Sequence, residues 1–479
     1  MTDTTTTSQQ PIIWWLRRDL RLTDNPALTA IAESGRPVVP LYIFDPTEAR
    51  LGAAPKFRLG LGLQTLQQSL AAKGLKLILR KGDALTVLRD VLRTCDGAGV
   101  YWSRLYDPQA IKRDTVVKTA LQEDGFEARS FAGHLMFEPW TVEKKTGGMF
   151  QVYTPFWKAV NQRNIGASLP APQSLRAADG GIATDSLADF EMAREMRRGA
   201  AIVAAHCVVG EEAAWARAEQ FLHERLSTYG AGRNHPAVNA TSGLSENLAW
   251  GEISPRQIWN LGRLVEDANG IKAEQYFKEL VWREFAYHLM YHTPHILKRN
   301  WRDQWDGFPW SEEETAALRA WQRGQAGIDL VDAGMRELYV TGTMHNRVRM
   351  VVASFLCKHL RQHWRQGMAW FEDCLIDWDP ASNAMGWQWV AGCGPDAAPF
   401  FRIFNPDGQR EKFDADHEYC HRWLAEGRAL PSKTALQFFD ACPKAWTMTA
   451  SDHRTAPIVD LRAGRQAALD AYEVLRRKE

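Results

Sequence analysis

Residues 11–137 alternate between short apolar runs and longer amphipathic stretches, and this alternation constrains the fold more than any other feature. The runs PIIWWL, PVVPLYIF, LKLILR, GVYWS and ARSFAG have the length and composition of buried strands. The stretches between them, such as KFRLGLGLQTLQQSLAAKG and DALTVLRDVLRTCDG, have helical periodicity. Strands separated by helices predict a parallel sheet, so we expect a Rossmann-like α/β domain over residues 11–137.

The rest of the chain changes in character twice. Residues 138–210 include LPAPQSLRAADGGIATDSL, whose Pro, Gly, Ala and Ser content predicts a long interdomain linker. Residues 211–479 are predicted to form an all-helical domain, with helices near 211–230, 254–265, 272–291, 312–323, 329–340, 345–366 and 413–426. The polar residues 1–10 are expected to be a disordered tail.

The totals exclude several classes of protein. A formal net charge of +1 excludes a broadly basic protein but allows a local basic groove. The seven cysteines contain no Cys-x-x-Cys pair, so neither a disulfide framework nor a metal site is expected. No secretory leader is visible, and no apolar run reaches the roughly 18 residues of a membrane span. We therefore expect a cytoplasmic protein.

Charged residues follow the first predicted strand, where the sequence reads RRDLRLTD. Ligands of open α/β sheets bind at the carboxyl ends of the strands. Arg17, Asp19, Arg21 and Asp24 therefore form either a ligand-binding edge or a solvated loop with internal ion pairs.

Two segments of the helical half carry candidate binding groups. Thr241, Ser242 and Ser245 cluster near a predicted helix start, where hydroxyl and free N–H groups suit a phosphate, although ordinary capping is the alternative. On the predicted helix 272–291, Glu279 lies i,i+4 from Arg283, which predicts either a buried ion pair or a recognition surface.

The segment TGTMHNRVRMVVASFLCKHL places polar groups at the start of an apolar helix. Asn346, Arg349 and Met350 share one helical face. A buried guanidinium needs an anion, and Asp377 is the expected partner of Arg349.

A loop containing Pro380 and Gly386 is expected to carry Asn383, Trp387 and Trp389. The chain has no P-loop and no evident pair of nucleophile and base. If it is an enzyme, a bound organic cofactor would supply the chemistry.

The segments WWLRRDLRLTDNPAL, NATSGLSENLAWGEISPRQ, KELVWREF, MHNRVRM and DAAPFFRIFNP, in this order, resemble the photolyase/cryptochrome family. The resemblance extends from Pro11 to about Trp446 and is greatest to bacterial members that repair cyclobutane pyrimidine dimers. It implies a Rossmann-like antenna domain and a helical domain that binds FAD. It also implies light-driven electron transfer from reduced, anionic FAD to a dimer flipped out of UV-damaged DNA.

The resemblance also assigns residues to the cofactor. It implies an ion pair of Arg349 and Asp377 beside the isoalloxazine, and it places Asn383 opposite flavin N5. The other implied FAD contacts are Tyr229, Thr241, Ser242, Gly243, Leu244, Ser245, Tyr276, Trp378 and Asp379. Some relatives have Arg at the position of Gly243.

A second set of residues is implied to face the lesion. Glu279 would hydrogen-bond the dimer and stabilise its radical anion. Trp282 and Trp389 would form aromatic walls for the dimer. Further contacts to lesion or DNA are implied for Arg233, Arg283, Asn346, Arg347, Met350 and Gln409. Trp387, Trp364 and Trp310 occupy the positions of a three-tryptophan chain that carries electrons to photoexcited oxidised flavin.

The alternative to a repair enzyme is a cryptochrome-type blue-light photoreceptor, which shares the fold and FAD. Glu279, Trp282 and Met350 favour repair. The antenna chromophore would be folate (methenyltetrahydrofolate), a deazaflavin or none, since Ala110 stands where folate-binding relatives have Glu. We expect a monomer that acts on UV-damaged DNA, with no obligate protein partner and no membrane contact.

Overall fold

Five parallel strands form one sheet in the order β3-β2-β1-β4-β5 in the computed structural model, which describes residues 10–178, 181–397 and 401–477. The strands are β1 (Ile12–Leu16), β2 (Val38–Phe44), β3 (Ile78–Lys81), β4 (Gly99–Ser103) and β5 (Glu127–Phe131). Each strand coincides with one of the apolar runs, so the predicted α/β domain is confirmed. The predicted tail lies almost entirely outside the described residues.

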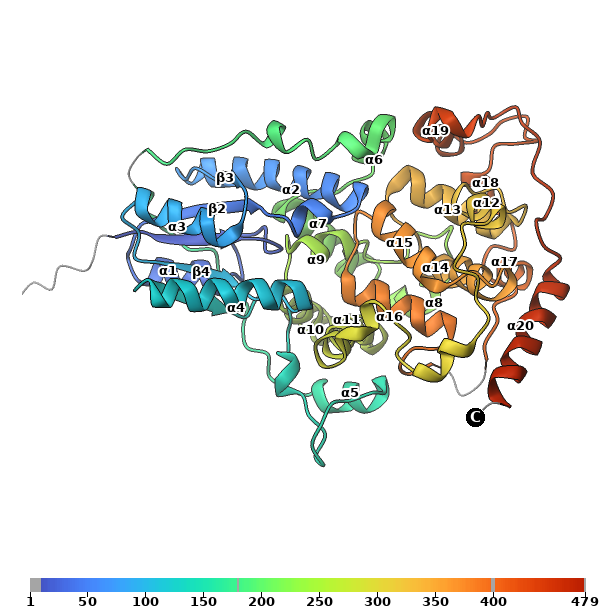
Figure 1. The fold of residues 1–479 in the computed structure, drawn as a ribbon, viewed down its shortest axis with the longest axis horizontal. Helices are drawn as coiled ribbons and strands as arrows, with labels where there is room; N and C mark the ends of the chain where they lie inside the picture. Colours follow the sequence, from blue (N-terminus) through green and yellow to red (C-terminus); the bar gives the residue numbers. More distant parts are fainter. Residues whose placement is uncertain (1–9, 179–180, 398–400, 478–479) are drawn as a thin grey trace, which may run out of the picture.

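Helices cover both faces of this sheet (Figure 1). The helices α1 (Pro26–Glu33) and α2 (Ala53–Ala72) share a core with Trp14 and Tyr42, whereas α3 (Ala84–Thr94) and α4 (Pro108–Glu123) share a core with Trp15 and Leu41. Strands buried on both faces are continuously apolar, which explains the sequence pattern.

The segment 138–210 contains short helices, among them α5 (Tyr153–Val160) and α6 (Ala200–Ala204). Phe156 of α5 lies 5.2 Å from Phe285, between ring centroids, so this part of the predicted linker packs into the helical half. The helices that follow are α7 (Glu211–Glu224), α8 (Tyr229–Gly232), α9 (Ser245–Trp250), α10 (Pro255–Asn269), α11 (Glu274–His292), α12 (Ala316–Gln322), α13 (Asp329–Thr341), α14 (Asn346–Ser354), α15 (Trp364–Cys374), α16 (Pro380–Ala391), α17 (Pro406–Phe413), α18 (Glu418–Trp423), α19 (Lys433–Ala441) and α20 (Leu461–Arg476).

The helical half is confirmed, but several predicted elements differ. The predicted helix 413–426 is helical only at the end of α17 and over α18. The predicted helix 211–230 ends at Glu224 and is followed by a 3-10 turn and α8. The predicted helix 345–366 is two helices: α14 continues as a π-helical turn to His359, and Arg361 then takes a left-handed φ of 51° before α15 begins. The loop expected around Asn383 is wrong, because that segment is helix α16. Asp379 caps this helix by accepting from Ser382 N at 2.7 Å, and Pro380 occupies its first position.

The carboxyl edge of the sheet packs against the helical half, so the charged residues after β1 form neither an open ligand edge nor a solvated loop. Arg17, Asp19, Arg21 and Asp24 are all buried. Arg21 Nη1 donates to Gly251 O at 2.9 Å, and Asp24 accepts from Arg256 Nε at 3.0 Å. These contacts hold α9 and α10 against the sheet domain.

Within the described ranges, no helix has both the length and the apolar character required to cross a membrane.

Candidate functional site

A cavity of about 530 Å³ opens among α11, α14, α15 and α16. It collects predicted residues from both the cofactor set and the lesion set: Arg233, Ser245, Glu279, Trp282, Arg283, Asn346, Arg349, Met350, Asp377, Trp378, Asp379, Asn383, Trp387 and Trp389. Residues that the sequence did not single out also line it, among them Phe371, Ser382 and Met385. The remaining predicted residues lie outside this lining.

The expected ion pair of Arg349 and Asp377 is present on the cavity wall. Arg349 Nη2 lies 2.8 Å from Asp377 Oδ2, and Arg349 Nε donates to Met344 O at 2.7 Å. Oδ1 of Asp377 is buried and has no hydrogen-bond partner within the described part of the chain. A buried carboxylate oxygen without a partner is costly unless a ligand donor meets it, so this atom indicates a bound group with an N–H.

Asp379 is held by a buried network that the sequence did not reveal. The Tyr287 hydroxyl donates to Asp379 Oδ2, and His134 Nε2 lies 2.8 Å from the same hydroxyl. Burial and the adjacent Arg283 guanidinium lower the pKa of His134 well below its usual value, so its ring is neutral. His134 and Tyr287 are far apart in sequence, and nothing local marks their contact.

The segment Thr241–Ser245 does not cap a helix through its side chains. Leu244 stands at the N-cap of α9 without a side-chain hydrogen bond, and Ser242 Oγ accepts from Leu244 N at 3.4 Å. The capping alternative is therefore wrong for this helix. The predicted residues Tyr229 and Tyr276 pack edge to face, with ring centroids 5.3 Å apart.

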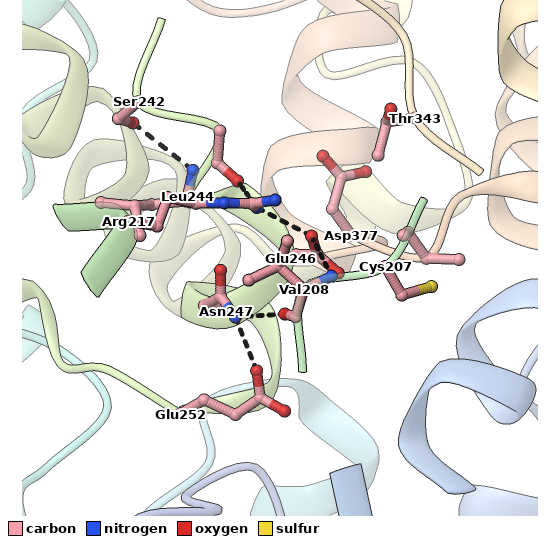
Figure 2. A network of polar contacts seen from close by, with 12 residues as sticks. Cys207, Val208, Arg217, Ser242, Leu244, Glu246, Asn247, Glu252, Thr343 and Asp377 are labelled. Carbon is pink, nitrogen blue, oxygen red and sulfur yellow. Dashed lines mark hydrogen bonds and ion pairs between the residues drawn. The ribbon is translucent and has the colours of Figure 1, made fainter. Parts of the chain in front are cut away.

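A network of charges lies behind this segment (Figure 2). Arg217 of α7 donates from Nη1 to Glu246 Oε1 at 2.8 Å. A Cβ at Gly243 would lie 3.5 Å from the same guanidinium nitrogen. Arg217 thus places a guanidinium beside the position at which some relatives have Arg. No local pattern indicates this contact, because Arg217 reads as one polar residue of an amphipathic helix.

Glu279 faces the cavity, but its ion-pair partner is not Arg283. Glu279 Oε1 accepts from Arg233 Nη1 and, at 2.9 Å, from Gln275 Nε2. Arg283 instead donates to His134 O at 2.9 Å. The ion pair considered for Glu279 and Arg283 is therefore wrong, because tertiary partners compete successfully with the neighbour one helical turn away.

The two predicted aromatic walls also make protein contacts. Trp282 stacks on Tyr153 of α5, with centroids 3.7 Å apart and planes 7° apart. Trp389 Nε1 donates to Asp396 O at 3.1 Å. Both rings are thereby held at the cavity wall.

Two residues predicted to contact DNA, Arg347 and Gln409, are not part of the cavity lining. Arg347 is in α14 and Gln409 is in α17. Arg347 Nη2 donates to Asn234 Oδ1 at 2.7 Å, and its guanidinium lies 4.6 Å from the ring centroid of Phe413. Gln409 is half-buried.

The three predicted electron-transfer tryptophans run from the cavity to the surface. Trp387 lines the cavity, Trp364 is fully buried and Trp310 is partly exposed. Trp387 contacts the backbone of α15 at Gly367, and α15 begins at Trp364. The His363 ring joins the other two, with centroids 5.3 Å from Trp364 and 5.2 Å from Trp310.

The donor set fits a flavin. The buried Asp377 Oδ1 can accept from an imide N–H, and Arg349 compensates the charge of this carboxylate. Asn383 is anchored through Nδ2 to Met368 O at 3.0 Å, and it adds a neutral polar group to the lining. Apolar and aromatic walls with a few convergent polar groups are typical of cofactor sites.

Comparisons with known proteins agree with this geometry. A family model described as DNA photolyase matches residues 12–173, and one described as FAD binding domain of DNA photolyase matches residues 276–474. The chain is 42% identical over 473 residues to the deoxyribodipyrimidine photo-lyase of Agrobacterium fabrum, covering 98% of each protein.

Solved structures are similar over almost the whole chain. A class III photolyase from Agrobacterium tumefaciens superimposes with a TM-score of 0.90 at 41% identity, covering 100% of both chains. The cryptochrome of Synechocystis sp. PCC6803 superimposes with a TM-score of 0.83 at 28% identity, covering 96% of this chain and 99% of that one. The matched domains, the relatives and the flavin-type cavity together show that the chain belongs to the DNA photolyase family, which includes the cryptochromes.

Proposed function

We propose that the protein repairs cyclobutane pyrimidine dimers in DNA, using light and reduced FAD. One observation carries the proposal: a single cavity collects the ion pair of Arg349 and Asp377 together with Glu279 and Trp282. The first pair suits a flavin, and the second suits the two linked pyrimidines of an extruded dimer. A cofactor and a substrate held in one cavity favour electron transfer between them.

The residues on the cofactor side would position the flavin and balance the charge beside it. Arg349 compensates the buried charge of Asp377. Asn383 would hydrogen-bond a reduced flavin without adding charge. FAD bound there would supply, after absorbing light, the electron that opens the cyclobutane ring. The implied phosphate and ribose contacts along 229–245 and at Tyr276 belong to the same proposal.

The residues on the substrate side would receive an extruded dimer. Trp282 and Trp389 offer flat aromatic faces, and Met350 adds a polarisable one. Glu279 presents a carboxyl group that hydrogen-bonds the bases. Extrusion costs a few kcal/mol, and less for damaged bases, which stack poorly.

The partner we propose is UV-damaged DNA, bound by a monomer in the cytoplasm. Arg233 and Arg347 would contact backbone phosphates, and Gln409 would face the duplex. The antenna chromophore we propose is folate or a deazaflavin, with the folate held in a mode that does not use the position of Ala110.

The test is a light-dependent repair assay. Chemically reduced protein is mixed with DNA that carries either cyclobutane dimers or 6–4 photoproducts, then illuminated with blue light or kept dark. We expect dimers to disappear in the light and 6–4 photoproducts to persist. Flavin photoreduction without loss of dimers would overturn the proposal and favour a photoreceptor.

A further inference from the structure

The Glu279 carboxyl group, which is proposed to contact the lesion, already has hydrogen-bond partners in the free protein. Glu279 Oε1 accepts from Arg233 Nη1 and from Gln275 Nε2, the latter at 2.9 Å. The side chains of Glu279 and Arg233 are 29% and 18% exposed, so the ion pair lies at the cavity mouth and solvent reaches it. Such a partly exposed pair is weak enough for a competing ion to break.

A second guanidinium lies near Arg233, because Arg347 Nη2 donates to Oδ1 of the adjacent residue Asn234 at 2.7 Å. Burial, followed by the charges of Arg233 and Arg402, lowers the pKa of Arg347. Arg233 also lies over Tyr229, with Cζ 5.4 Å from the ring centroid. A concentration of guanidiniums with mutual repulsion attracts phosphate, which accepts the planar fork of Arg through two oxygens.

We propose that Arg233 exchanges partners when DNA binds: its guanidinium leaves Glu279 for a backbone phosphate and so frees the carboxyl group for the extruded base. This rests on the proposed function and deepens it. Without this exchange, a phosphate bound to Arg233 would lie next to the Glu279 carboxylate, which contacts the same guanidinium. The two negative charges would repel each other. The exchange removes this repulsion, and it makes Glu279 available when DNA is present.

The exchange predicts a cost in the absence of a lesion. In the free protein Glu279 competes with phosphate for Arg233, so the ion pair lowers the affinity for any duplex. Removing the carboxylate charge should therefore tighten binding to undamaged DNA, and the gain should require Arg233. A gain caused merely by one fewer negative charge would not require Arg233.

The experiment is a double-mutant cycle on flavin-loaded protein in the dark, with an undamaged duplex as the probe. We expect Glu279→Gln to tighten binding by about threefold or more, and by less than about twofold in an Arg233→Met background. Equal gains in both backgrounds, or no gain in the first, would overturn the exchange. Arg233→Met by itself should reduce the slope of log K against log salt by about one.

A matched carboxylate on the same helix provides the control. Glu274 pairs with Lys278 at 2.5 Å on the exposed side of α11. Glu274→Gln should change DNA affinity by the same factor with and without Arg233. The flavin absorption spectrum and the unfolding temperature of each variant confirm that it is folded and loaded. Because undamaged DNA is bound in the dark, this readout stays independent of repair, and failure of the proposed function would appear instead as dimers that persist in the light.

Discussion

Arg58 of α2 donates from Nε to Glu246 Oε2 of α9 at 2.9 Å, and its side chain is completely buried. Its two remaining nitrogens bind Glu252 at 2.9 and 2.6 Å. Asn247 Nδ2 also reaches Glu252, as Figure 2 shows. Glu246 directly follows Ser245, so a side chain of the sheet domain positions the segment proposed to hold the FAD phosphates.

Replacing Arg58 with Met should destabilise the protein and weaken FAD binding. The substitution leaves the buried Glu252 without its cation and leaves Glu246 with Arg217 alone, which costs about 3–5 kcal/mol. Thermal unfolding and FAD release followed by fluorescence measure both effects. Arg80→Met is the control, because Arg80 pairs with a half-exposed Asp90 and its loss should cost less than about 1 kcal/mol. Equal effects of the two variants would contradict the role of Arg58.

Gly367→Ala should disturb photoreduction of oxidised flavin. A Cβ at Gly367 would overlap the ring of Trp387, whereas one at Gly386 meets nothing within 4 Å. Gly386 is the residue next to Trp387, so Gly386→Ala is a matched control that should leave photoreduction intact. Transient absorption of the flavin and tryptophan radicals measures the yield. If Gly367→Ala behaves like its control, Trp387 is not the entry point to the flavin.

Trp364→Phe should block photoreduction while sparing repair that starts from chemically reduced protein. Trp364 is buried between the cavity and the partly exposed Trp310, and phenylalanine is much harder to oxidise. Trp321→Phe tests specificity, because Trp321 also packs against Trp387, with centroids 6.1 Å apart, but is fully buried and is not one of the three predicted electron-transfer tryptophans. A loss of repair from the reduced Trp364→Phe protein would show that this residue does more than carry electrons.

Stability should fall as pH rises from about 4.5 to about 7 because of Glu284. Burial raises the pKa of Glu284 from 4.5 to about 7, although Arg283 and the backbone N–H groups of Phe137 and Met136 oppose the rise. The folded protein therefore binds the proton more tightly than the unfolded chain, and ionisation weakens folding by up to about 3 kcal/mol.

The variant that isolates this effect is Glu284→Gln, which keeps an acceptor for Met136 N. The difference in unfolding free energy between wild type and variant, measured by denaturant titration from pH 4 to 8, should change with the predicted sign. Parallel pH curves would show that Glu284 does not titrate in this range.

Local sequence pattern was sufficient to predict the helices and strands in which apolar residues recur at a regular period. The five strands and most helices follow from the period of apolar residues, because burial of one face or both dictates that period. The pair of Arg349 and Asp377 was also predictable, since a guanidinium on an apolar helix needs an anion. Helix α16 was missed because Pro380 and Gly386 suggest a loop, whereas Pro at the first helical position is favourable.

The sequence by itself determined the two halves of the molecule, the family resemblance and the residue types available to the cavity. Apart from the pair of Arg349 and Asp377, tertiary structure decided which charges meet. Arg58 and His134 each bind a group more than a hundred residues away, and Arg217 binds one more than twenty residues away. Glu279 pairs with Arg233 and not with Arg283, its neighbour on the same helix. An ion pair depends on the distance between charged atoms in space and on their shielding from water, and neither quantity is written in local periodicity.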